Sequence, residues 1–245
     1  MGCGREQDAV ALTRVGTGGG PTRRYRPVCL TFGPVAARLL DMASEAQAKL
    51  VSAAMQLMLR QGYSATGIDS ICAEAGVSKG AFYHSFRSKE ELALAALESF
   101  FRRGFEELQS IDVRDAPPAE RLPLFVERLA DRAELLWKNG CLIGGLTTEM
   151  ALANDELQRH VARQFDELAE IVVQLAAPFV KALPISGLSA ASVAADLLAF
   201  VEGAVVLARG HRDPRRLRPQ IRRYATMLRA LAAAPSVSPR RSRRD

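Results

Sequence analysis

The fold is decided by residues 67–86, which read GIDSICAEAGVSKGAFYHSF. Ile71 falls on the inner face of a short predicted helix, 67–75, and Phe82 returns to the core from a second one, 78–85. Between the two helices stand a small residue, a glycine that can adopt positive φ, and an apolar valine. Such a turn lets two short helices cross at a steep angle, so that the second can lie in a major groove. The stretch therefore predicts a helix-turn-helix.

Helical periodicity continues on both sides of this stretch. Apolar residues recur at steps of three and four across 44–61, and a glycine then stops the run. Ser88 and Glu91 have the spacing of a capping box, which predicts the start of a helix over 88–108. Residues 44–108 are therefore expected to form a three-helix DNA-binding domain that continues into a fourth helix.

A second helical region is predicted after a proline-containing linker at 112–118. Its helices are expected at 119–138, 141–152, 154–182, 189–210 and 214–233. The residues placed to cap them are Asn154, Ser189 and Asp213. Pro178 is expected to kink or end the third of these helices. No segment alternates like a strand for long, so the predicted fold class is all-α: a helix-turn-helix domain followed by a helical bundle at 119–234.

The two ends of the chain differ in composition from its middle. Residues 1–43 are rich in Gly, Arg and Thr, residues 235–245 are basic, and both are predicted to be disordered. The formal charge of +6 comes from these ends, because 1–41 and 235–245 each carry +3 and the remainder is neutral. Net charge therefore gives no argument for specific DNA binding, and the ends are expected to be dispensable for it.

Several other classes of protein are not indicated. The 4 cysteines are widely spaced, which fits neither a disulfide framework nor a metal site, and a reducing cytoplasm is expected. No Ser/His/Asp arrangement, nucleotide loop or signal peptide is recognisable, so neither an enzyme nor a cofactor is predicted. The most apolar window, 190–208, is interrupted by Asp196 and Glu202, which indicates a buried helix rather than a membrane span.

From Lys49 to Ala96 the chain resembles the TetR family of transcriptional regulators. The matching positions are Gly62-Tyr63, Thr66, Ala75-Gly76-Val77-Ser78-Lys79-Gly80, Phe82-Tyr83, Phe86 and Ser88-Lys89-Glu90. One departure is Cys72, where the family usually has alanine, and it is expected to be buried and inert. The resemblance implies that 78–85 is the recognition helix.

The residues expected to contact DNA fall into two groups. Thr66, Tyr83 and Lys89 are predicted to hold the protein against the DNA backbone, with Thr66 also capping the second helix. The residues predicted to face base edges are Ser78, Lys79, Gly80 and His84, among which the glycine would permit close approach. An alternative for Tyr83 is that its ring packs between the neighbouring phenylalanines instead.

The second half of the chain resembles one subgroup, in which a Gly-Cys-Leu turn opens the sixth helix, here at residues 140–142. The resemblance implies a small-molecule inducer, and for some members a reactive electrophile. Predicted pocket residues are Phe125, Leu129, Trp137, Cys141, Leu146, Met150 and Phe165, with simple core packing as the alternative. Cys141 is expected to have a lowered thiol pKa from nearby helix N-terminal amides, with Lys138 able to add a cation. The alternative is a structural thiol in a tight turn.

Helices 189–210 and 214–233 carry more apolar surface than one bundle needs. The resemblance implies that this pair forms a homodimer, which would bind a palindromic operator as a repressor. Three alternatives remain at this point: a helical adaptor that binds only protein, an uncharacterised enzyme, and a protein that binds DNA non-specifically through its ends.

Overall fold

The structure is a computed structural model that describes residues 44–150, 154–183, 185 and 187–234. The predicted disordered ends, 1–43 and 235–245, lie outside these residues. Within them the chain forms helices and no strand, which confirms the all-α prediction. The elements are α2 (Glu45–Gln61), α3 (Ile68–Ala75), α4 (Lys79–Ser85), α5 (Lys89–Gln109), η1 (Pro118–Glu120), α6 (Arg121–Trp137), α7 (Leu142–Met150), α8 (Asp155–Ala182), α9 (Ala190–Gly210), η2 (Pro214–Arg216) and α10 (Leu217–Ala233).

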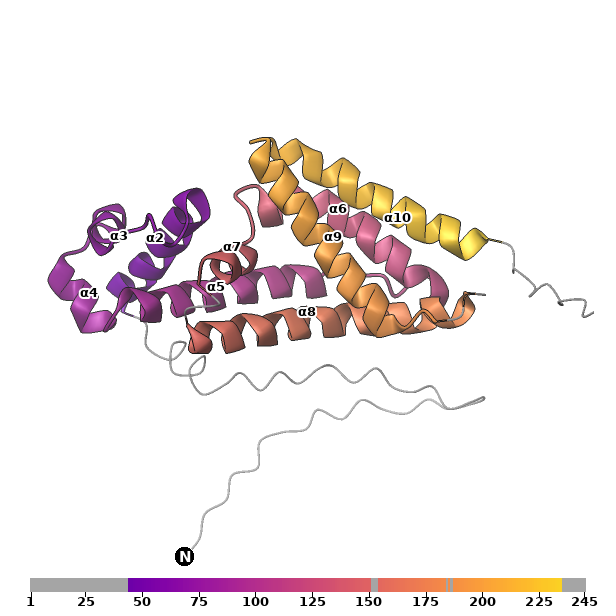
Figure 1. Cartoon of the computed structure of the whole chain (residues 1–245), viewed down its shortest axis with the longest axis horizontal. Helices are drawn as coiled ribbons and strands as arrows, with labels where there is room; N and C mark the ends of the chain where they lie inside the picture. The colour runs from indigo at the N-terminus through magenta and orange to yellow at the C-terminus, as the bar shows by residue number, and fades with distance from the viewer. Residues whose placement is uncertain (1–43, 151–153, 184, 186, 235–245) are drawn as a thin grey trace, which may run out of the picture.

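Helices α2, α3 and α4 gather at one end of the molecule (Figure 1). Helix α5 runs from that end into the second group of helices, where it lies alongside α8. The core of the first group is closed by Leu50, Ile71 and Phe82, none of which has any exposed surface. Burial of these side chains is the main favourable contribution to folding here, and it fixes α3 and α4 against α2.

The predicted helix ends are found where their chemistry places them. The hydroxyl oxygens of Ser78 and Ser88 accept hydrogen bonds from backbone N–H groups three residues later, each at 3.2 Å. Asn154 and Ser189 cap α8 and α9 in the same way, at 2.9 and 3.0 Å. Each bond satisfies a donor that the first turn of a helix leaves free, and so these caps define where the helices begin.

The structure corrects two local expectations. Glu91 does not complete a capping box with Ser88, because its carboxylate accepts the backbone N–H of Arg87 at 2.8 Å instead. Of the two outcomes expected for Pro178, a kink or a helix end, the end is excluded, since α8 continues through Ala182. Proline removes only one N–H donor, and the buried side chains that follow it, such as Phe179, keep the last turn against the core.

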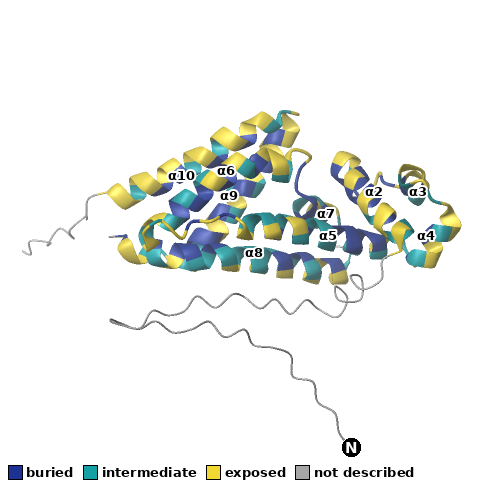
Figure 2. Ribbon diagram, turned by 180° about the vertical axis from the view of Figure 1, so that it is seen from behind, coloured by how far each residue is buried: buried dark blue, intermediate teal, exposed yellow. Residues whose placement is uncertain are grey.

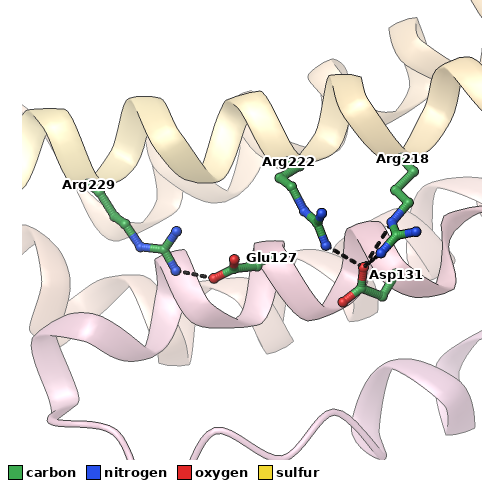
Figure 3. A network of polar contacts seen from close by, with 5 residues as sticks. All are labelled: Glu127, Asp131, Arg218, Arg222 and Arg229. Carbon is green, nitrogen blue, oxygen red and sulfur yellow. Dashed lines mark hydrogen bonds and ion pairs between the residues drawn. The ribbon is translucent and has the colours of Figure 1, made fainter.

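The second group of helices is tied together by charge as well as by packing. Asp131 on α6 accepts from Arg222 and Arg218 on α10, with N–O distances of 2.6 and 2.9 Å. Glu127 and Arg229 form a further pair one turn away (Figure 3). These side chains are partly exposed, so each pair contributes little alone, but together they fix α10 along α6.

Helix α9 is unusually apolar for its surroundings. Among the described helices it alone is long and apolar enough to cross a membrane, yet only 33% of its most apolar stretch is buried. Figure 2 shows exposed residues along the outer turns of α10. Leu207 on α9 and Met227 on α10 are 54% and 62% exposed, respectively. This pair of helices therefore presents apolar side chains on the protein surface.

Candidate DNA-recognition helix and ligand cavity

The turn between α3 and α4 depends on one glycine. Gly76 ends α3 with φ of +65°, in the left-handed region that favours glycine. Its N–H donates to the carbonyl of Ala73, and the N–H of Val77 donates to that of Cys72 at 3.0 Å. The chain is thereby turned within two residues, so that α4 starts at once from the Ser78 cap. Cys72 is buried, as expected.

One face of α4 is free of the core. All five residues predicted on this helix to meet DNA are exposed: Ser78, Lys79, Gly80, Tyr83 and His84. Figure 2 shows this end of the molecule as the one where α3 and α4 carry exposed residues. The opposite face of the helix is held by Phe82. A helix with one buried anchor and a polar, exposed face has the form that major-groove recognition needs.

Within this face, Tyr83 and Lys79 have different surroundings. The Tyr83 ring meets Phe82 edge to face, with ring centroids 5.0 Å apart, but the side chain stays 59% exposed. Its hydroxyl is therefore free to meet a phosphate. Lys79 pairs with Asp69 on α3 at 2.6 Å, and this pairing raises the pKa of the lysine. Both side chains are exposed, so the pair is weak and its opening costs little.

Thr66 and Lys89 differ from expectation. Thr66 is fully buried and its hydroxyl donates to the carbonyl of Gly62 at 2.7 Å, while the cap of α3 is Gly67. Lys89 donates to the carbonyls of Tyr63 and Thr66, at 3.2 and 3.1 Å. The predicted capping role of Thr66 is wrong, and the ammonium of Lys89 binds backbone carbonyls of the protein itself. Both residues fasten the loop that joins α2 to α3.

Tyr63 organises this loop. The Lys89 nitrogen lies 3.9 Å from the centre of the Tyr63 ring, a cation–π contact. The Tyr63 hydroxyl donates to the Glu90 carboxylate at 2.9 Å. Burial, together with this carboxylate, raises the pKa of Tyr63. The first turn of α5 is therefore locked to the loop from two consecutive residues.

A side chain from the second group of helices also grips this loop. Glu149, in the last turn of α7, accepts the backbone N–H groups of Tyr63 and Ser64, at 3.1 and 2.9 Å. The same carboxylate lies so close to Gly62 that a Cβ there would meet it at 2.7 Å. Sequence reasoning did not find this contact, since nothing local to Glu149 indicates its partner. It gives the two groups of helices a second connection besides α5.

A cavity of about 370 Å³ lies among α5, α6, α7, α8 and α9, with part of its wall formed by α2. Of the predicted pocket residues, Phe125, Leu129, Trp137 and Cys141 line it. An adjoining cavity of about 450 Å³ is lined by Leu146 and Phe165 and shares Cys141 with the first. Met150 lines neither of these two cavities. Phenylalanines 100, 101 and 105 of α5 also line the first cavity and were not predicted, because helical periodicity does not distinguish lining from core.

The thiol of Cys141 is not activated as expected. It is buried and its pKa is raised well above the ordinary value, first by burial and then by the neighbouring Glu202 carboxyl. The backbone N–H groups of Ile143 and Gly144 at the start of α7 do lower this pKa, as the sequence predicts, but their effect is smaller. The predicted lowered pKa of Cys141 is therefore wrong. The missing information was Glu202, which reaches Cys141 only through the crossing of α9 and α7.

The comparisons with known proteins agree with this arrangement. The family model for bacterial regulatory proteins of the TetR family matches residues 50–96, and that for the LmrA/YxaF-like regulator C-terminal domain matches 118–222. The transcriptional regulator AcuR of Cereibacter sphaeroides is 37% identical over 121 residues, 47% of this chain and 54% of AcuR, so the match spans about half of that relative. The transcriptional repressor DhaR of a Mycobacterium species is 33% identical over 150 residues, 60% of this chain and 70% of DhaR.

Solved structures show the same likeness. A TetR regulator from Chloroflexus aurantiacus is 28% identical, with a TM-score of 0.63 over 76% of this chain and 94% of its own. A regulatory protein TetR from Rhodobacter sphaeroides is 25% identical, with a TM-score of 0.64 over 75% of this chain and 98% of its own. The chain therefore belongs to the TetR family of bacterial regulatory proteins and is a DNA-binding transcriptional regulator.

Proposed function

We propose that the protein is a homodimeric repressor, which binds a palindromic operator and leaves it when a small molecule enters the α5–α9 cavity. The observation that carries the proposal is the exposed polar face of α4, held on a glycine turn against a rigid core. Lys79, Gly80 and His84 face base edges, and Ser78 stands at the helix start beside them. Tyr83 contacts a phosphate and fixes the register. The protein acts in the cytoplasm, where the DNA is.

A dimer is proposed because a single recognition helix reads only one half-site. The surface for it is the α9/α10 groove, lined by Phe200, Gly203, Ala204, Leu207, Gln220, Arg223, Thr226 and Met227. Two-fold symmetry would place this groove against its copy and cover the apolar face of α9. Sedimentation of the full chain tests this. The wild type should sediment as a dimer, and Leu207→Glu should sediment as a monomer, whereas an unchanged variant would rule out the groove.

Release is proposed to act through α5 and α7, which both connect the two groups of helices. Helix α5 forms part of the cavity wall and begins at the DNA-binding end, and α7 runs from the cavity at Cys141 to the loop held by Glu149. A ligand that shifts these helices changes the separation of the two recognition helices, which the helical repeat of DNA fixes. By linkage, operator must lower ligand affinity by the same factor.

The ligand is proposed to bind reversibly. A buried thiol with a raised pKa is a poor nucleophile, so the alternative of an electrophile that modifies Cys141 is the less favoured one. The cavity is mostly apolar and of a size that suits a small organic molecule.

Genome-wide mapping of the sites bound by the full chain tests the proposal. The expected result is a set of inverted repeats whose half-sites lie about one helical turn apart. Binding without a shared sequence would instead favour non-specific attachment through the charged ends. Genes beside the mapped sites then supply compounds for calorimetry, where equal ligand affinity with and without operator would contradict the release mechanism.

A further inference from the structure

One carboxyl group in the cavity has no counter-ion among the described residues. Glu202 on α9 lines both the 370 Å³ cavity and the adjoining one, and burial raises its pKa. It shares a hydrogen bond with the Cys141 thiol and forms no ion pair in the part of the chain that the structure describes. A carboxylate in such surroundings is costly to ionise unless a positive charge is brought to it.

The backbone is shaped to admit this carboxyl. A Cβ on Gly144 of α7 would lie 2.5 Å from Glu202 Oε2, so any other residue at 144 would push the acid away from α7. The opening of α7 therefore keeps room for Glu202 beside Cys141. This arrangement involves two helices distant in sequence, and it places an acid where the remaining lining is largely apolar.

The cationic side chains that line the two cavities are exposed, and two of them contact other groups. Arg103 and Lys138 line the cavity but are exposed, and the Arg103 guanidinium lies 2.6 Å from the sulfur of Met55. Arg209, which lines the adjoining cavity, is exposed and reaches the carbonyl of Arg60 at 3.5 Å. None of these side chains neutralises the carboxyl from within the protein.

The other walls are rich in aromatic rings. Phe100, Phe101, Phe105, Phe125 and Trp137 all line the same cavity as Glu202. Aromatic faces attract cations, most strongly where water is excluded. A ligand that combines an apolar body with a positive charge would therefore interact favourably with the rings and the acid at once, whereas an anion would be repelled by Glu202.

We propose that the cavity binds a hydrophobic organic cation, an aryl- or alkylammonium, with Glu202 as its counter-ion and the aromatic rings as its apolar walls. This inference rests on the proposed function, in that it names the chemical class of the releasing ligand. Any proton that Glu202 carries passes to solvent as the cation enters, and no covalent bond is formed.

The test uses the full chain and two ligands of the same shape, benzyltrimethylammonium and its neutral carbon analogue neopentylbenzene. Trp137 is the only tryptophan in the chain and lines the cavity, so its fluorescence reports binding. Glu202→Gln should weaken binding of the ammonium by about tenfold or more, and binding of the neutral analogue by less than about twofold. Asp196→Asn, an exposed acid on the same helix, is the matched control and should change neither.

A pH series supplies a readout that misfolding would not imitate. Because the raised pKa leaves Glu202 more protonated at low pH, wild-type affinity for the ammonium should rise with pH and level off once the acid is ionised, while Glu202→Gln should stay flat. The other titratable or charged groups that line these cavities are Tyr63, Cys141, Arg103, Glu107, Lys138, Glu149 and Arg209, and they are present in both proteins.

If Glu202→Gln lowers the affinity for both ligands by the same factor, so that the ratio of the two affinities is unchanged, the proposal is overturned. Binding as expected without loss of operator would instead leave the ligand class standing and refute the release mechanism.

Discussion

Replacement of Glu149 by glutamine tests whether α7 holds the DNA-binding group of helices. The carboxylate accepts two backbone N–H groups, from Tyr63 at 3.1 Å and from Ser64 at 2.9 Å. Glutamine has the same shape, but its amide nitrogen cannot accept a hydrogen bond. One of the two contacts is therefore lost, and a donor then faces a donor.

The expected magnitude follows from the type of bond. A hydrogen bond to a charged group contributes about 1.5–3 kcal/mol, and exposure of Glu149 places this one at the lower end. A loss of about 1.4 kcal/mol corresponds to a tenfold change in a local opening equilibrium. Hydrogen exchange at the Tyr63 and Ser64 amides should accordingly become about tenfold faster.

Hydrogen exchange on the full chain, resolved for the 62–66 loop, is the assay. Glu156→Gln removes an exposed acid from the next helix and should leave exchange in this loop unchanged. If Glu149→Gln also leaves it unchanged, the Glu149 contacts do not stabilise the loop, and the coupling through α7 must be abandoned.

Three further predictions concern single side chains. Lys89→Ala should lower the unfolding temperature and weaken DNA binding, because the Lys89 ammonium binds the Tyr63 and Thr66 carbonyls. The slope of log affinity against log salt should change by much less than the roughly one unit expected for a lost phosphate contact. A change of a full unit in a salt titration would show that Lys89 contacts a phosphate directly. Gly80→Ala should keep or slightly raise thermal stability, since a Cβ at this position meets only the Ser78 hydroxyl at 3.6 Å. Anisotropy titration should nevertheless show weaker operator binding. Unchanged affinity for the operator would exclude close approach of α4 to the bases. Cys141 should react slowly with maleimide near neutral pH and faster only well above the pH at which an ordinary thiol ionises, because its raised pKa keeps it protonated. Rapid labelling near neutral pH, detected on the Cys141 peptide by mass spectrometry, would contradict the burial of this thiol.

The features that could be predicted from sequence are those with local causes. Helix periods, the serine and asparagine caps and the glycine turn at 76 each arise from residues within one or two turns, so α4 was placed to within a residue. The partners of Lys89, Glu149 and Glu202 were missed because each is distant in sequence: those of Lys89 and Glu149 are backbone groups of the α2–α3 loop, and that of Glu202 is Cys141 just before α7. Such contacts depend on how helices cross, and periodicity specifies which face is apolar but not what it meets.

The interruption of an apolar helix by Glu202 was visible in the sequence. It was interpreted as evidence against a membrane span, whereas the structure adds that the acid enters a cavity. An ionisable residue inside an otherwise apolar helix is costly to bury, so it is a signal of function that sequence reasoning can use. For Thr66 the sequence was misleading, since a hydroxyl at the edge of a DNA-binding motif was expected to meet DNA, whereas it is fully buried here.

The exposed face of α4 is proposed to read base sequence. Selection from a random DNA pool, carried out in parallel with the full-length wild type and Lys79→Ala, tests it most directly. We expect an inverted repeat for the wild type, and for Lys79→Ala a repeat with the same half-site spacing whose base preference is changed at symmetric positions. If both proteins select the same bases, with Lys79→Ala merely binding more weakly, Lys79 contacts only the DNA backbone and the proposed reading face is contradicted.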